Sequence, residues 1–207
     1  MIISVRLRYL LLAAGTLFLP GLARAQLNFA PGTYQLANGN KGNALLKLVL
    51  AEGGRPTVVI GSKAGRERTF RPADLPAFTI DVHRFIRVND FRFLSGTDAA
   101  FPGATWLEAL ETGPIELFYY YYQVEMGPNF KAHVKLPVLR KFGTSIFFAY
   151  APGHTPGFDP KLAPGGFVAA LFPADPVLQR QFATNAISRT QLTAVVHAYN
   201  QGVRLTP

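Results

Sequence analysis

Histidine is the residue type in this chain best suited to hold a metal ion or to act as a general base. The four histidines are His83, His133, His154 and His197. Zinc sites are usually built from ligands at short, fixed spacings. No two of these histidines are close in sequence, and the chain contains no cysteine. We therefore expect no metal site and no cofactor, and a cysteine nucleophile is excluded.

His154 belongs to the most conspicuous motif, Pro152-Gly153-His154-Thr155-Pro156-Gly157. This motif resembles the Pro-Gly-His-Thr turn of hydrolases with the metallo-β-lactamase fold, in which the histidine is a zinc ligand. That family also has an upstream cluster of two histidines, an aspartate and a third histidine, which this chain lacks. We therefore reject His154 as a metal ligand and interpret the motif as a loop rich in Pro and Gly.

Other catalytic motifs are also missing from the sequence. No serine lies in a Gly-x-Ser-x-Gly turn, and there is no glycine-rich loop for a nucleotide phosphate. A pair of acids for glycoside hydrolysis has six candidates, Asp81, Asp90, Glu108, Glu111, Glu116 and Glu125. No spacing singles out one pair, so we predict no catalytic residue. A periplasmic hydrolase that uses His154 or an acid pair is the alternative hypothesis.

Two arginines are candidates for binding an anion. If Asn89-Asp90 forms a two-residue hairpin turn, Arg87 and Arg92 lie directly opposite each other. Like charges in that position repel unless an anion such as a phosphate or carboxylate lies between them. The alternatives are a solvated basic face or a different strand register.

The aromatic run Phe118-Tyr119-Tyr120-Tyr121-Tyr122 is the second binding candidate. In a strand, Leu117, Tyr119 and Tyr121 share one face, and Phe118, Tyr120 and Tyr122 share the other. One face must meet the core. Tyr120 and Tyr122 could then stack against sugar rings or a flat partner surface. The alternative is that helices cover one face and a second sheet covers the other.

The first 25 residues have the pattern of a secretory signal peptide. Arg6 and Arg8 precede an apolar run, and Ala23-Arg24-Ala25 provides small residues for cleavage after Ala25. The apolar run is too short for a membrane span, so we expect no stable span after cleavage. Removal of this segment lowers the formal charge from +9 to +6. Localisation is therefore predicted to be periplasmic or secreted, and the modest charge does not favour nucleic acid as a partner.

The remaining residues 26–207 are expected to form a single domain of the α+β class. Short aromatic and β-branched runs from about 30 to 150 predict a mostly antiparallel β-sheet or a small sandwich. Two or three packed helices are predicted between about 160 and 202. Asp175-Pro176 begins one helix, and Ser188 with Gln191 forms a capping box at the start of another.

Longer segments resemble an uncharacterised family of exported proteins from Bacteroidota-type bacteria, which has no assigned activity. The matching segments are Pro31-Gly32-Thr33-Tyr34, Thr69 to Leu75, Leu107 to Phe118, and Asp175 to Asn200. The resemblance implies export and strands followed by helices, and it implies no catalytic residue.

The leading functional hypothesis is a non-catalytic exported protein that binds an anionic glycan or an envelope protein. Arg87, Arg92, Tyr120 and Tyr122 are its contact candidates. An outer-membrane β-barrel is the other alternative to the hydrolase, although the helical pattern near the C-terminus argues against it.

Overall fold

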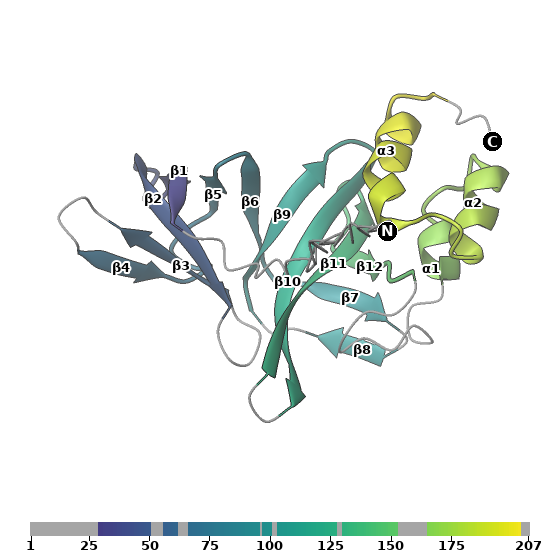
Figure 1. The fold of residues 1–207 in the computed structure, drawn as a ribbon. Coiled ribbons are helices and arrows are strands. Elements are labelled where there is room, and N and C mark those ends of the chain that lie inside the picture. The colour runs from purple at the N-terminus through teal and green to yellow at the C-terminus, as the bar shows by residue number, and fades with distance from the viewer. Residues whose placement is uncertain are drawn as a thin grey trace, which may run out of the picture.

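The computed structural model describes residues 29–50, 56–61, 66–95, 97–100, 103–127, 130–152 and 165–203. The expected signal peptide and His154 lie outside these ranges. Within them, twelve strands form one sheet, and three helices follow in the chain (Figure 1). The first six strands are β1 (Ala30–Gln35), β2 (Lys41–Leu50), β3 (Pro56–Gly61), β4 (Glu67–Phe70), β5 (Ala77–Ile80) and β6 (His83–Val88). The other six are β7 (Arg92–Ser95), β8 (Thr97–Ala100), β9 (Thr105–Glu111), β10 (Ile115–Gly127), β11 (Phe130–Lys141) and β12 (Ile146–Ala149).

The sheet has the order β4-β3-β2-β1-β5-β6-β9-β10-β11-β12-β7-β8. Every neighbouring pair among the described strands is antiparallel except β12 and β7, which run parallel. The predicted α+β class with a mostly antiparallel sheet is confirmed. The described strands form a single sheet and not the two sheets of a sandwich.

The predicted hairpin around Asn89-Asp90 is wrong. β6 pairs with β5 and β9, whereas β7 pairs with β12 and β8. The chain turns out of β6 at Asp90, which has a positive φ of 48°, and the next side chain, Phe91, is fully buried. Burial of this ring takes the chain away from β6 before β7 begins, so Arg87 and Arg92 are not cross-strand partners.

The two faces of β10 have different neighbours. Leu117 packs against the helices, so we call its side of the sheet the helix face. Phe118 lies on the other side with Phe91 and Phe147, and we call that side the cleft face. The alternation predicted for the aromatic run places Tyr119 and Tyr121 on the helix face, and Tyr120 and Tyr122 on the cleft face.

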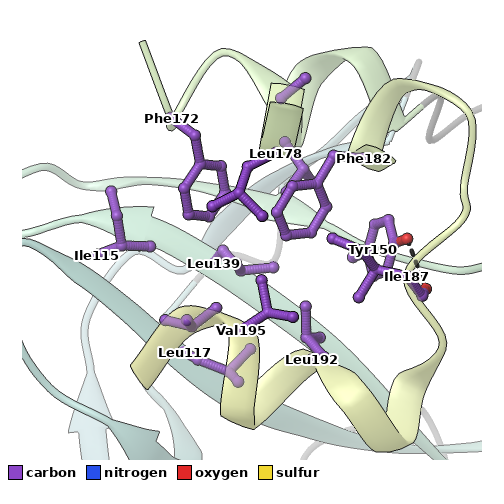
Figure 2. Close-up of a cluster of buried hydrophobic side chains, with 13 residues drawn as sticks. Ile115, Leu117, Leu139, Tyr150, Phe172, Leu178, Phe182, Ile187, Leu192 and Val195 are labelled. Atoms are coloured by element: carbon purple, nitrogen blue, oxygen red, sulfur yellow. Dashed lines mark hydrogen bonds between the residues drawn. The ribbon is translucent and has the colours of Figure 1, made fainter. Parts of the chain in front are cut away.

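Helices α1 (Gly165–Ala169), α2 (Pro176–Ala183) and α3 (Arg189–Asn200) cover the end of the helix face where β10 begins. Figure 2 shows Phe172, Phe182 and Leu192 meeting β-strand residues in one apolar cluster. Apolar burial in this cluster fixes the helices on the sheet. A hydrogen bond of 2.7 Å from the Tyr150 hydroxyl to the Ile187 carbonyl adds a polar link.

The predicted helix starts are confirmed. Asp175 caps α2 by accepting from the backbone N–H groups of Val177 and Leu178. Ser188 and Gln191 form the reciprocal capping box of α3. The prediction of two or three helices is confirmed, since the described residues contain three. The position of α1 was not predicted, because a helix of five residues leaves little periodic pattern in the sequence. Among the described helices, none is long and apolar enough to cross a membrane.

Two further clusters stabilise the rest of the sheet. On the helix face, Leu46 and Val58 from the N-terminal strands pack with Trp106 and Tyr121, so this end of the sheet folds over β9 and β10. On the cleft face, Phe91 and Phe147 cover the middle of β10. The sheet therefore buries both faces of β10 but leaves the cleft face of β1, β2 and β5 less covered.

Candidate binding site

A cleft of about 410 Å³ opens on the cleft face, between the C-terminal half of β6 and the turn that joins β11 to β12. Its lining residues are Ile86, Arg87, Val88, Asn89, Arg140, Phe142, Gly143, Thr144, Ser145 and Phe147. One guanidinium, that of Arg140, therefore meets an amide and two hydroxyls around the concavity. Arg87 borders it with its backbone, because its side chain shares the helix face with that of its cross-strand partner Trp106.

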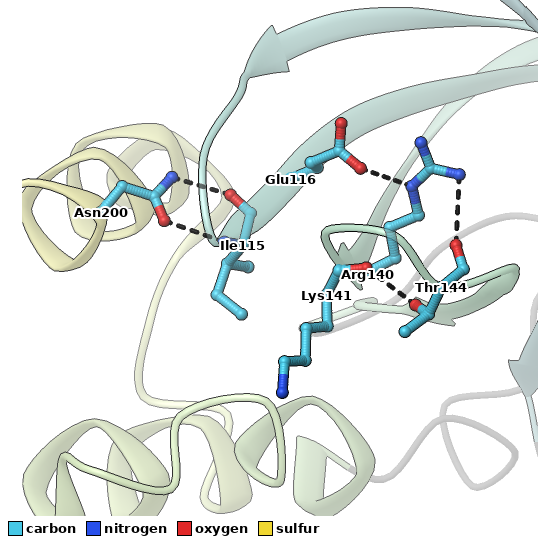
Figure 3. Close-up of polar contacts among 6 residues, drawn as sticks. All are labelled: Ile115, Glu116, Arg140, Lys141, Thr144 and Asn200. Atoms are coloured by element: carbon cyan, nitrogen blue, oxygen red, sulfur yellow. Dashed lines mark hydrogen bonds and ion pairs between the residues drawn. The ribbon is translucent and has the colours of Figure 1, made fainter.

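Polar contacts with β10 and with the turn after β11 hold the Arg140 side chain in this cleft (Figure 3). Its Nε donates to Oε2 of Glu116 over 2.6 Å, and its guanidinium lies 4.8 Å from the ring centre of Phe147. The ring of Phe118 is 5.4 Å away. A side chain fixed by an ion pair and two aromatic rings loses little further freedom when it binds a ligand.

Local pairing explains this geometry. Glu116 and Arg140 are direct cross-strand partners in the β10–β11 pair, so their side chains lie on the same face. The turn after β11 is closed by Thr144, whose backbone N–H and hydroxyl both donate to the Lys141 carbonyl. Gly143 has a φ of 79°, a conformation that favours glycine. This turn forms one wall of the cleft.

Arg140 is the cation of the cleft, and Glu116 offsets its charge. The guanidinium of Arg87 lies on the helix face, where its Nη1 donates to the Ala73 carbonyl over 3.1 Å. The rim also carries Phe142, which is 70% exposed. The cleft therefore combines a fixed guanidinium, hydrogen-bonding groups and an accessible aromatic ring.

The structure separates the two predicted arginines. Arg87 lines the cleft, whereas Arg92 is exposed and pairs with Ile146 in the parallel β7–β12 pair. Because Ile146 follows Ser145 of the cleft, the backbone of Arg92 lies beside the cleft wall. The two residues lie near one concavity, but not in the predicted arrangement.

Tyr120 and Tyr122 stack on each other with ring centres 5.6 Å apart. Tyr120 is only 2% exposed and its ring lies 5.0 Å from that of Phe91, whereas Tyr122 is half-buried. Burial raises the pKa of each phenol to about 12. Tyr120 is therefore a core residue, and its ring is not presented to solvent.

A buried carboxylate lies on the helix face, away from the cleft. Glu108 on β9 is 3% exposed and is hydrogen-bonded to Nδ1 of His83 and to the hydroxyl of Tyr121. Burial and the bond to Glu108 raise the pKa of Tyr121. The amine of Lys135 lies 5.1 Å from the ring centre of Tyr121. This group links β6, β9, β10 and β11 through polar contacts.

Most of the predicted acids have basic partners. Glu111 is 3.1 Å from Nδ1 of His197, and Glu125 is 3.8 Å from Nζ of Lys131. Asp81 and Asp90 lie at turns with positive φ. Across the described residues, no three His, Cys, Asp or Glu side chains are grouped closely enough to hold a metal ion.

Sequence reasoning did not identify Arg140, Phe142 or Thr144 as parts of a site. The signal for Arg140 was an acid and a base at nearly equal distances from the β10–β11 turn. It could not be used without the register, which a bulge between Glu125 and Gly127 shifts by one residue. Comparisons with protein-family models, with curated proteins and with solved structures found no match.

Proposed function

We propose that this chain is an exported, non-catalytic protein that binds an anionic glycan in the cleft next to Arg140. Export is supported by the basic, apolar and small-residue pattern of the first 25 residues. A periplasmic or secreted location follows from that pattern. In that location the cleft would meet glycans of the cell envelope or of the extracellular medium.

The observation that carries the proposal is the fixed guanidinium of Arg140 in an open concavity. Arginine recognises carboxylate and phosphate groups through paired N–H donors. Glu116 engages Nε of Arg140, and the remaining guanidinium donors include Nη1, which is 3.4 Å from the Thr144 carbonyl. Such a weak contact is readily exchanged for a charged acceptor.

A sugar is favoured over a bare anion by the neutral groups of the same cleft. The amide of Asn89 and the hydroxyls of Thr144 and Ser145 can exchange hydrogen bonds with sugar hydroxyls. The exposed ring of Phe142 offers an apolar surface to a sugar ring. A carboxylate-bearing sugar would use both sets of contacts.

The test uses calorimetric titration of the chain without residues 1–25 with digalacturonate and with a neutral disaccharide. We expect binding of digalacturonate only, weakening as salt is raised because the attraction is electrostatic. Arg140→Gln should weaken binding roughly tenfold. Arg180→Gln, which removes an exposed charge from α2, should have no effect.

Glu116→Gln is a second test variant, and it should change the affinity for digalacturonate in the opposite direction. It removes the carboxylate that offsets Arg140, so binding of digalacturonate should become tighter. This gain cannot arise from unfolding. Equal affinity for the neutral and charged sugars, or unchanged binding in both Arg140→Gln and Glu116→Gln, would reject an anionic glycan as the ligand.

A further inference from the structure

A row of polar side chains crosses four strands on the cleft face, away from the cleft itself. Asn43 pairs with Thr33, and Thr79 pairs with Arg84. The Oγ1 atoms of Thr33 and Thr79 are 3.0 Å apart and join the two halves of the row. We call these four residues the polar row. Side chains of cross-strand partners lie on one face, so the row presents one amide, two hydroxyls and one guanidinium together.

The polar row lines a depression of about 340 Å³. Lys41 also lines this depression, and Asn43, Thr33 and Arg84 are exposed. In the part of the chain that the structure describes, neither Lys41 nor Arg84 has a carboxylate partner. The depression therefore combines two unneutralised cations with neutral hydrogen-bonding groups, whereas the cleft combines the guanidinium of Arg140 with such groups.

The depression and the cleft adjoin on the same face of the sheet. Ala77 lines the depression, Ile86 lines the cleft, and the two residues are cross-strand partners in the β5–β6 pair. Arg84 and Ile86 are two positions apart on β6, which is about 7 Å along a strand. One apolar pair is thus all that separates the polar surfaces of the two concavities.

We infer that the polar row is a second subsite for the glycan bound next to Arg140, so that the natural ligand is an anionic polysaccharide. This inference rests on the proposed function. Arg84 lies on β6 and Arg140 on β11, with β9 and β10 between them in the sheet. Three strand spacings amount to about 14 Å, so one sugar ring cannot contact both arginines. A chain of linked acidic sugars contacts both, with the Ala77–Ile86 pair under its apolar ring faces.

The experiment compares digalacturonate with octagalacturonate. The longer ligand should bind the natural chain about tenfold or more tightly, because occupation of one subsite raises the local concentration at the other. Arg84→Gln and Lys41→Gln should remove most of this advantage and leave digalacturonate binding at the cleft unchanged. Arg180→Gln, the matched loss of one exposed arginine charge on α2, should preserve the advantage.

The outcomes separate the two proposals. Equal affinity for the short and long ligands in the natural chain, or an unchanged advantage in both Arg84→Gln and Lys41→Gln, overturns the second subsite and leaves the cleft proposal standing. Failure of both ligands to bind the natural chain overturns the proposed function together with this inference. Circular dichroism of each variant establishes that the sheet is intact.

Discussion

The hydroxyl of Tyr121 donates a hydrogen bond to the buried carboxylate of Glu108. These residues lie on the neighbouring strands β10 and β9, and His83 on β6 reaches the other oxygen of the same carboxylate. A carboxylate is expensive to remove from water unless its oxygens are hydrogen-bonded. Glu108 therefore ties three strands together, and its loss leaves the phenol of Tyr121 without an acceptor.

Glu108→Gln should lower the free energy of unfolding by about 2 kcal/mol, because the amide keeps one acceptor oxygen and places an NH2 group where the second carboxylate oxygen accepted. Urea unfolding followed by circular dichroism measures the change. Glu125→Gln is the matched control, since the Glu125 side chain is 71% exposed and 3.8 Å from Lys131. Equal stability of the two variants would show that the buried carboxylate does not stabilise the sheet.

Tyr150→Phe should lower the free energy of unfolding by about 1–3 kcal/mol, because it leaves the buried Ile187 carbonyl without its donor. Tyr199→Phe is the comparison. Tyr199 packs against the same apolar cluster, and no hydrogen bond of its hydroxyl exists among the described residues. Thermal unfolding of both variants should show a clear loss for Tyr150→Phe only, and matching midpoints would contradict the role of this bond.

Gly165→Ala should disrupt the contact between α1 and α2. A Cβ atom at Gly165 would lie 1.8 Å from the Phe182 carbonyl oxygen, so the helices must separate. Gly166→Ala adds the same methyl group one residue later, where nothing lies within 4 Å. We expect a lower unfolding midpoint for Gly165→Ala and an unchanged or higher one for Gly166→Ala, because alanine favours helix. Limited proteolysis should cut the first variant faster in its helical region.

The raised pKa of the buried Tyr120 phenol predicts that the folded chain loses stability at alkaline pH. This pKa is about 12 in the folded chain, because burial disfavours the ionised phenol, and near the ordinary value of 10.0 in the unfolded chain. The unfolded state therefore releases the proton first, and the stabilisation present below pH 10 is lost as the pH rises toward about 12. Urea unfolding at pH 8 and at pH 11 should show a smaller loss for Tyr120→Phe than for the natural chain. An equal loss of stability in Tyr120→Phe and in the natural chain would show that ionisation of Tyr120 is not the cause.

Local patterns predicted the elements better than their pairing. The capping box at Ser188 and the cap at Asp175 depend on residues three positions apart or fewer, so they could be read without the fold. The aromatic run at Tyr120 likewise has the strand alternation expected from its own sequence. The partner of β7 could not be predicted, because it is β12, which lies far along the chain.

The same distinction applies to the candidate site. Arg87 was selected because of a presumed neighbour, Arg92, yet its side chain lies on the helix face and only its backbone borders the cleft. Tyr120 was selected for its type, and burial removes its ring from the surface. Side-chain chemistry can be read from residue types, whereas exposure and convergence depend on contacts between distant strands.

The parallel pairing of β7 with β12 has a consequence for the order of folding. Every strand from β9 to β12 must be in place before Arg92 can meet Ile146, and such distant contacts form late because loop closure opposes them. Hydrogen exchange should therefore find the amides of β7 less protected than those in the middle of β10. The wall of the cleft next to Ile146 is then the last part of the sheet to become rigid and the first to open.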